Sequence, residues 1–232
     1  MRTFHRMSSK SPVKASTPDF SLEDQFDGPV CGLDEVGRGP LAGPVVAAAV
    51  VIPASVRAMD FIPHIRDSKK LGKKMLANLY AEITSHCQWG VVEISPQEID
   101  KINIFQASLK AMREALHLLD LPQAALVDGK HIPQNMPCSA EAVIKGDSKS
   151  VSIAAASIIA KVTRDKIMCD LHEQHPHYGW NTNVGYPSQQ HRDAIDAHGV
   201  TVHHRRSFAP VRNFLEFGMT SPTSPKPSVT AA

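Results

Sequence analysis

Short apolar runs in the first part of the chain predict strands. The runs at 29–36 (PVCGLDEV) and 44–52 (PVVAAAVVI) are rich in valine and bounded by Gly and Pro, as buried strands often are. The run at 87–94 (CQWGVVEI) predicts a third strand. Two shorter runs, at 124–128 (AALVD) and 141–147 (EAVIKGD), predict two more, and each ends in an aspartate.

Segments of helical periodicity lie between and after these runs. Apolar residues between 73 and 84 recur at helical spacing and predict an amphipathic helix. The sequence at 95–98 (SPQE) supplies an N-cap serine, a first-turn proline and a capping-box acid, which predict the start of another helix. Strands followed by alternating strands and helices indicate an α/β domain with a mixed sheet. Further helices are predicted over 104–119, 152–173 and 188–197.

Composition favours one domain with short extensions. The chain has 232 residues, 42% of them hydrophobic, which is enough to bury one sizeable core. Segments 1–28 and 218–232 lack apolar periodicity and are rich in Ser and Pro, so we expect both to be disordered and the folded domain to cover 29–217. The formal net charge of +2 permits a nucleic-acid partner without requiring one.

The sequence suggests neither a membrane span nor secretion. The longest apolar stretch, 40–54, is interrupted by Gly and Pro and is shorter than the roughly 20 residues that cross a bilayer. Segment 1–18 is basic but has no apolar core, which argues against a secretory signal and leaves an organellar targeting segment open. We therefore expect a cytoplasmic protein with reduced thiols, because no C-x-x-C pair occurs among Cys31, Cys87, Cys138 and Cys169.

Four acids stand out because they follow or end apolar runs. Carboxylates at strand ends can converge at one edge of a sheet, where without cations they would repel one another and raise their pKa values. Bound Mg²⁺ removes that cost, since it prefers hard oxygen ligands and shares them readily with phosphate. These acids are Asp34, Glu35, Asp128 and Asp147.

The adjacent acids Asp34 and Glu35 pose a geometric problem, because neighbours on a regular strand point to opposite faces. Either the strand ends there or one acid contributes differently. Gly37 and Gly39, on either side of Arg38, favour a strand end, since glycine allows a sharp turn and close approach to a ligand. An ordinary surface turn is the alternative. A dinucleotide fingerprint is excluded, because prolines interrupt the helix that it requires.

The string GLDEVGRGPLAGPVVAAAVV at 32–51 closely resembles the opening signature of the ribonuclease HII family. The resemblance extends from about Pro29 to Phe214 and implies a ribonuclease H-like fold with a helical C-terminal extension. Five further blocks follow in the family's order: DSKKL at 67–71, VDGK at 127–130, KGDS at 145–148, AASIIAKVTRD at 155–165 and HHRRSF at 203–208.

The resemblance also implies an activity. Asp34, Glu35, Asp128 and Asp147 match the family's catalytic carboxylates, which hold two Mg²⁺ or Mn²⁺ ions. One ion lowers the pKa of the attacking water and the other stabilises the departing oxygen. The expected reaction is hydrolysis of the RNA strand of RNA·DNA hybrids and incision 5′ of single ribonucleotides in duplex DNA, leaving 3′-hydroxyl and 5′-phosphate ends. We expect a monomer.

Specificity would depend on the ribose 2′-hydroxyl. In the family, the backbone of a GRG loop senses this group, and Gly37, Arg38 and Gly39 match that loop. A tyrosine in a GYPT-like block packs on the neighbouring deoxyribose, and here VGYPS supplies Tyr186, with Val184 where the family more often has lysine. A half-buried core aromatic is the alternative interpretation of Tyr186.

Basic residues supply candidate phosphate contacts, although such clusters are usually solvated faces. Lys145 and Lys149 bracket Asp147, which would place them beside the phosphate bound by the metals. Lys161 and Arg164 share one helical face, consistent with a ridge along a nucleic-acid backbone. The predicted basic contacts are Lys69, Lys145, Lys149, Lys161, Arg164, Arg205 and Arg206.

Two other functions are compatible with these residues. The chain could bind duplexes without cutting them, on a degenerate nuclease scaffold. It could also be another nuclease of the same fold, such as a resolvase or integrase, which would accept all-DNA substrate. The pair His203 and His204 lacks a carboxylate or thiol at ligand spacing, so phosphate contact or a structural role is favoured over a metal site.

Overall fold

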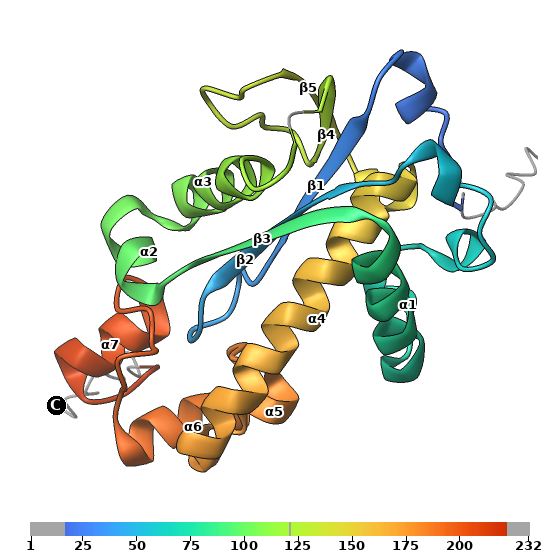
Figure 1. The fold of residues 1–232 in the computed structure, drawn as a ribbon. Helices are drawn as coiled ribbons and strands as arrows, with labels where there is room; N and C mark the ends of the chain where they lie inside the picture. The colour runs from blue at the N-terminus through green and yellow to red at the C-terminus, as the bar shows by residue number, and fades with distance from the viewer. Residues whose placement is uncertain (1–16, 121, 222–232) are drawn as a thin grey trace, which may run out of the picture.

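A mixed five-stranded sheet forms the centre of the structure, a computed structural model that describes residues 17–120 and 122–221 (Figure 1). The strand order is β3-β2-β1-β4-β5. β1 pairs antiparallel with β2 and parallel with β4, β2 pairs antiparallel with β3, and β4 pairs parallel with β5. The strands are β1 (Val30–Val36), β2 (Val45–Val51), β3 (Gln88–Ile94), β4 (Ala124–Asp128) and β5 (Ser139–Val143).

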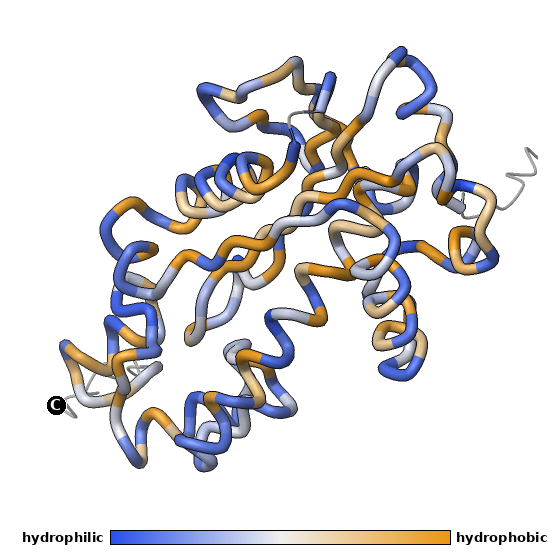
Figure 2. The backbone as a smooth tube through the Cα atoms, in the orientation of Figure 1, coloured by the Kyte–Doolittle hydropathy of each residue, from blue (hydrophilic) through white to orange (hydrophobic). Residues whose placement is uncertain are grey.

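Helices cover both faces of this sheet. α1 (Lys73–His86) and α4 (Val151–Gln174) pack on one face, and α2 (Pro96–Ile102) and α3 (Ile104–Leu116) lie on the other. Because β2 is covered on both faces, every one of its residues is buried, as its unbroken apolar sequence predicts. Figure 2 shows this hydrophobic band along the central strands.

The start of α4 lies unusually close to β1. A Cβ atom on Gly32 would come within 2.1 Å of the backbone carbon of Ser152, so only glycine permits this approach. The contact brings α4 against the strand that carries Asp34, and the site described below depends on it.

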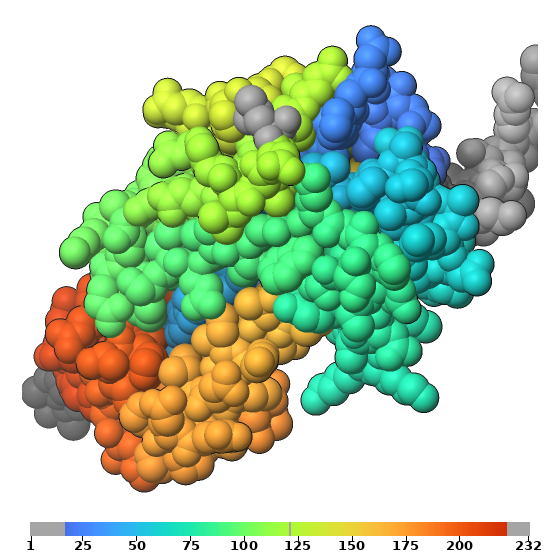
Figure 3. Space-filling model, in the orientation of Figure 1, coloured from blue at the N-terminus to red at the C-terminus, as the bar shows by residue number. Residues whose placement is uncertain are grey.

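The C-terminal segment adds a helical unit beside the sheet. α5 (Trp180–Asn183), α6 (Gln189–His198) and α7 (Ala209–Phe217) pack with the end of α4 around the buried side chains of Trp180 and Ile195. In the space-filling view this orange and red segment covers one end of the molecule (Figure 3). Short 3₁₀ helices span Glu23–Gln25, Ala54–Val56, Ile62–His64, Ser68–Lys70, Gly146–Ser148 and Pro176–Tyr178.

The mixed sheet flanked by helices confirms the predicted fold class, and each predicted strand and helix is present within a few residues of its expected bounds. One boundary is wrong in a way that affects the site. The last strand ends at Val143, and Asp147 lies in the following 3₁₀ helix rather than at a strand end. The intervening Lys145 adopts a left-handed backbone conformation, with φ of 56°, which cannot continue a strand.

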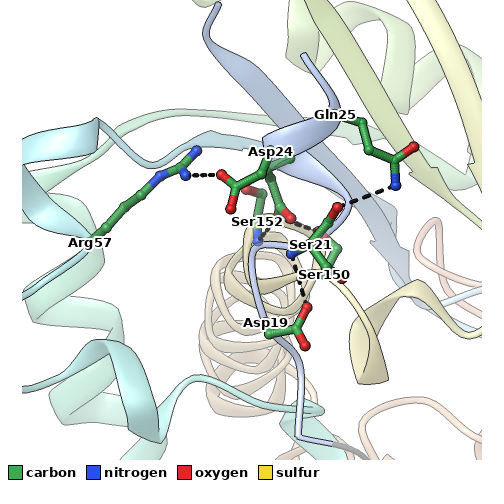
Figure 4. A network of polar contacts seen from close by, with 8 residues as sticks. Asp19, Ser21, Asp24, Gln25, Arg57, Ser150 and Ser152 are labelled. Carbon is green, nitrogen blue, oxygen red and sulfur yellow. Dashed lines mark hydrogen bonds and ion pairs between the residues drawn. The ribbon is translucent and has the colours of Figure 1, made fainter. Parts of the chain in front are cut away.

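The prediction that 1–28 is disordered is wrong for residues 17–28, which pack against the start of α4 (Figure 4). Asp19 forms a bridge with Ser150, and the buried carboxylate of Glu23 accepts hydrogen bonds from Ser150 Oγ at 2.6 Å and Ser152 N at 2.9 Å. Arg57 pairs with Asp24. Residues 1–16 lie outside the described part of the chain.

At the other end, the predicted disordered tail is also partly wrong. Thr220 is buried, and its backbone N–H donates to Asp196 Oδ1 at 2.7 Å. Residues 222–232 lie outside the described part of the chain. None of the helices in the described ranges is both long enough and apolar enough to span a membrane.

Candidate active site at one edge of the sheet

Asp34 and Glu35 occupy consecutive positions within β1 and project from opposite faces of the sheet. The strand continues to Val36, so the expected strand end before the GRG loop lies two residues later. Asp34 pairs in register with Ala48, whose side chain belongs to the face covered by α4, and Glu35 pairs with Ala47 on the face covered by α3. One acid therefore approaches the sheet edge from each side.

Asp128 lies beside Asp34 because β4 runs parallel to β1, with Leu33 paired to Val127 in the preceding register position. Asp128 also anchors the segment that carries Asp147. Its Oδ1 atom accepts a hydrogen bond from Gly146 N at 2.6 Å, which holds the 3₁₀ helix against the end of β4. A tight turn rather than a strand thus brings the fourth acid to the edge.

Each of the four acids interacts electrostatically with at least one of the others, and Asp128 interacts with all three. Burial raises the pKa of Asp34 well above its usual value, and the charges of Glu35 and Asp128 raise it further. The pKa of Glu35 is raised by burial, partly offset by Arg38, and raised again by Asp128. Burial also raises the pKa of Asp147, followed by the charges of Asp67 and Asp128. All four predicted carboxylates are therefore close enough to perturb at least one other member of the group.

Asp67, Ser68 and Ser157 belong to this site although we did not predict them individually. Asp67 acts on Asp147, and Ser157 of α4 makes a side-chain hydrogen bond with Asp34. Ser68 Oγ lies 2.7 Å from Ser157 Oγ, which joins the DSKKL and AASIIAKVTRD blocks. The two blocks were recognised as motifs, but the sequence does not show that their serines meet.

The donor set suits a hard divalent cation, since it consists of carboxylate oxygens whose raised pKa values reflect burial and mutual repulsion. Within 17–120 and 122–221, however, no three acid, histidine or cysteine side chains already surround one point. Several oxygens have other partners: Asp34 Oδ1 accepts from Glu35 N at 2.8 Å, and Glu35 Oε1 accepts from Arg38 at 3.3 Å.

A small cavity of about 110 Å³ adjoins Glu35 and Asp128 on the α3 side of the sheet. Arg38, Lys130 and His131 also line it, so its wall combines acidic and basic groups. It opens the acidic edge to solvent on the face opposite α4.

The GRG loop directly follows β1 and is held from behind by two buried arginines. Gly37 has φ of +92°, and a Cβ atom there would come within 2.2 Å of Arg164 Nε, so the position requires glycine. Arg205 donates to the carbonyl oxygens of Gly37, Arg38 and Gly43 at 2.6, 3.1 and 3.0 Å. Arg164 donates to Pro44, Ala42 and Val184 at 3.0, 3.1 and 2.9 Å.

This arrangement corrects the prediction that Arg164 and Arg205 contact substrate phosphate. Both side chains are fully buried, so neither reaches a bound nucleic acid. Burial lowers the pKa of Arg164 to about 10 and of Arg205 to about 9, with the charge of Arg164 contributing to the second shift, and both remain cationic at neutral pH. Their role is to bind loop carbonyl groups rather than phosphate.

Tyr186 lies against the GRG loop. It is 45% exposed, so about half of its surface is open to solvent. A Cβ atom on Gly39 would lie 3.2 Å from Tyr186 Cε1 and 3.8 Å from Cδ1, which places one edge of the ring against that glycine. A backbone bond from Leu41 N to Gly185 O, at 2.7 Å, ties the two loops together.

The remaining predicted basic contacts are at the surface. Lys69, Lys145, Lys149 and Arg206 are exposed, whereas Lys161 is half-buried and donates to Asp165 Oδ1 at 2.6 Å. The charges of Lys69 and Lys70 partly offset the raised pKa of Asp147.

Comparison with known proteins decides the family. The family model "Ribonuclease HII" matches residues 31–211. A ribonuclease HII of Magnetococcus marinus is 51% identical over 190 residues, which cover 80% of this chain and 87% of that protein. The chain belongs to the ribonuclease HII family. Ribonuclease HII cleaves RNA in RNA·DNA hybrids, so the chain is a nuclease of the hydrolase class.

Solved structures show the same fold as this ribonuclease HII chain. The ribonuclease H2 of Pyrococcus horikoshii has a TM-score of 0.68 and 27% identity, covering 82% of this chain and 98% of that one. Bst-RNase HIII, solved in complex with Mn²⁺, has a TM-score of 0.66 and is 20% identical. The match covers 82% of this chain and 70% of the Bst-RNase HIII chain. The expected ribonuclease H-like fold is thus confirmed.

Proposed function

We propose that this ribonuclease HII also incises duplex DNA on the 5′ side of a single embedded ribonucleotide, using Asp34, Glu35, Asp128 and Asp147 as its catalytic carboxylates. The observation that carries the proposal is that these four acids perturb one another's pKa values at one sheet edge, and that two of them, Asp34 and Glu35, directly precede the GRG loop. The products would be a 3′-hydroxyl and a 5′-phosphate.

The carboxylates would hold two divalent cations, Mg²⁺ or Mn²⁺. Ribonucleases H use divalent metal ions, and Bst-RNase HIII, which shares this fold, was solved in complex with Mn²⁺. Such ions supply an activated water and neutralise charge on the departing oxygen. The protein's own contribution is to keep the acids together: Ser157 bonds Asp34, and Asp128 bonds the backbone that carries Asp147.

Recognition would come from the GRG loop and Tyr186. The exposed backbone at Gly39 lies against one edge of the Tyr186 ring, so a sugar that packs on the ring would have its neighbour close to the loop. A 2′-hydroxyl is both a donor and an acceptor, which lets backbone amides and carbonyls distinguish RNA from DNA. Arg38, Lys69, Lys145, Lys149, Lys161 and Arg206 would contact the phosphate backbone.

An assay on three matched duplexes tests the proposal: one with a single ribonucleotide, one with a full RNA strand, and one all-DNA. With Mg²⁺ or Mn²⁺ we expect a single cut 5′ of the lone ribonucleotide, yielding a 3′-hydroxyl end that a polymerase extends. The all-DNA duplex should remain intact. Cleavage of the hybrid alone would reject the proposed single-ribonucleotide activity, and cleavage of DNA would reject the proposed specificity.

We also propose that the enzyme acts as a monomer in the cytoplasm.

A further inference from the structure

Two buried histidines lie directly behind Tyr186. The side chains of His191 on α6 and His204 in the HHRRSF block are 0% and 2% exposed, and their Nε2 atoms are 3.2 Å apart. His191 Nδ1 lies 3.0 Å from the carbonyl oxygen of Tyr186. His204 forms an isolated bridge with Ala42, which follows the GRG loop. The pair thus connects the two loops proposed to read the substrate.

The hydrogen-bond partners of His191 determine where its proton lies. The carbonyl oxygen of Tyr186 can only accept, so Nδ1 of His191 must carry the hydrogen. Trp180 Nε1, which can only donate, lies 3.0 Å from His191 Nε2. His191 Nε2 is therefore an acceptor, and the ring is neutral.

His204 has the complementary arrangement. The backbone N–H of Thr201 donates to His204 Nδ1 at 2.9 Å, so Nδ1 is an acceptor. Nε2 of His204 must then carry the hydrogen, and it shares the single acceptor lone pair of His191 Nε2 with Trp180 Nε1. One directed chain of hydrogen bonds runs from Thr201 through both rings to the carbonyl oxygen of Tyr186.

The surroundings favour these neutral rings. Burial lowers the pKa of both histidines, and nearby His175 and His203 lower that of His204 further. Two aromatic rings also pack against His204: the ring centroid of Tyr178 lies 4.9 Å from that of His204, and the centroid of Trp180 lies 5.4 Å from it. A buried donor chain with defined polarity holds its final acceptor in one position more firmly than packing alone does.

We propose that His191 is a positioning residue for Tyr186, and that it sets how closely the tyrosine ring lies against the GRG backbone. The inference rests on the proposed function, in which Tyr186 packs on a deoxyribose beside the ribonucleotide. The Tyr186 carbonyl oxygen also accepts from Ser188 N at 2.8 Å, so losing the His191 donor leaves it with one of its two bonds and lets the ring move away from Gly39. The Tyr186 ring would contact the substrate where a ribose is followed by a deoxyribose. Cleavage of a continuous RNA·DNA hybrid, which lacks this junction, should therefore depend less on the position of the ring.

A matched pair of substitutions separates this role from general stability. In His191→Asn the amide nitrogen replaces Nδ1 and retains the donor to Tyr186, but the acceptor for Trp180 and His204 is lost. In His191→Gln the amide oxygen replaces Nε2 and retains that acceptor, but the donor to Tyr186 is lost. Each variant removes the hydrogen bonds on one side of the His191 ring and keeps those on the other. We therefore expect the two variants to lose similar amounts of thermal stability.

The readout is the ratio of kcat/KM on a duplex with one ribonucleotide to kcat/KM on an RNA·DNA hybrid. We expect the ratio to fall about tenfold in His191→Gln, as for loss of one buried hydrogen bond, and to stay within about twofold of wild type in His191→Asn. An unchanged ratio in His191→Gln, or an equal fall in both variants, would overturn the proposal.

Tyr186→Ala distinguishes failure of this inference from failure of the proposed function. If Tyr186→Ala leaves the ratio unchanged, the proposed role of the ring is wrong. If Tyr186→Ala lowers the ratio and His191→Gln does not, only the positioning role is wrong. Should His191→Gln fail to fold, ¹⁵N NMR of the wild-type rings decides the matter. We expect the hydrogen on Nδ1 of His191 and on Nε2 of His204. The opposite tautomers would refute the hydrogen-bond series from Thr201 to the Tyr186 carbonyl oxygen, and with it the positioning role.

Discussion

Arg205 Nη2 donates to the carbonyl oxygen of Gly37 at 2.6 Å, from a side chain with no exposed surface. The guanidinium also binds Arg38 O and Gly43 O, so three loop carbonyls meet one buried cation. No acid forms an ion pair with Arg205 in the described part of the chain, and its burial is offset by these carbonyl dipoles and by the Phe208 ring, whose centroid lies 5.1 Å from the guanidinium carbon. The shape of the GRG loop therefore depends on a residue that the substrate does not touch.

Replacing Arg205 by lysine should damage both stability and activity. Lysine keeps the charge but lacks the planar fork that reaches three carbonyls. We expect the free energy of unfolding to fall by about 2–4 kcal/mol, because buried carbonyl groups lose charged partners. Urea denaturation measures this loss. The adjacent Arg206 is exposed, so Arg206→Lys is the matched control and should change stability by less than about 0.5 kcal/mol. Equal effects of the two substitutions would contradict the proposed role of Arg205.

Alanine substitutions at Gly37 and Gly39 should have different effects, one on the conformation of the loop and the other on substrate preference. Gly37→Ala places a Cβ atom within 2.2 Å of Arg164 Nε at a positive φ, so we expect it to unfold the loop and lose most activity. Gly39 has no such strain, and its Cβ atom would lie 3.2 Å from the Tyr186 ring. Gly39→Ala should keep the wild-type melting temperature and lose activity chiefly on the single-ribonucleotide duplex. A stable Gly37→Ala enzyme with normal rates would show that the loop conformation is not required.

The buried histidine pair should make stability depend on pH. The pKa of His204 is lowered from its usual value of 6.5 to about 3, first by burial. The unfolded chain therefore takes up this proton below about pH 6.5 while the folded protein does not, so stability is complete above that pH and is lost as pH falls. Between pH 7 and 5 the loss from His204 is about 2 kcal/mol.

Asp34, Glu35 and Asp147 act in the opposite direction, because their raised pKa values favour the protonated folded state at low pH. The comparison is therefore made between wild type and His204→Asn, by urea denaturation at pH 7 and pH 5. His204→Asn should lose less stability over this range. Parallel losses in the two proteins would show that His204 is not held neutral.

Metal addition should stabilise the folded protein through Asp34. Without metal, the ionised Asp34 is buried near two other acids, so Asp34→Asn should raise the melting temperature of the metal-free protein. Saturating Mn²⁺ should raise that of wild type, with about 2.7 kcal/mol gained at 100 times Kd, and should affect Asp34→Asn much less. Glu216 is exposed on α7, so Glu216→Gln serves as the control and should respond to Mn²⁺ as wild type does. A wild-type response in Asp34→Asn would remove this acid from the metal site.

The sequence predicts the fold well because its elements have strong local signals. The all-apolar run of β2 fits only a strand covered on both faces, and the cap at Ser95 forms as expected, accepting a hydrogen bond from Glu98 N. The position of Asp147 was harder to predict, because a left-handed Lys145 ends the strand early and leaves no local signal. Likewise, the packing of Glu23 on α4 depends on contacts between residues more than 120 positions apart.

Within the site, residue types were easier to predict than their roles. Acids that end apolar runs are unusual enough to be noticed, and they do lie at one edge of the sheet. Arg164 and Arg205 have the same sequence signature as phosphate-binding residues, and only their burial shows that they bind carbonyl groups instead. The hydrogen bond between Ser157 and Asp34 was not predictable, since it requires α4 to lie against β1 at Gly32.

The most direct test of the central claim is an anomalous diffraction measurement on crystals soaked in Mn²⁺. The account predicts a peak within about 2.3 Å of a carboxylate oxygen of Asp34, with Asp128 and at least one of Glu35 and Asp147 rotated to bind the same ion or a second ion beside it. Crystals of Asp34→Asn should lose or weaken that peak. Well-ordered wild-type crystals at saturating Mn²⁺ with no peak among these four acids would contradict the account.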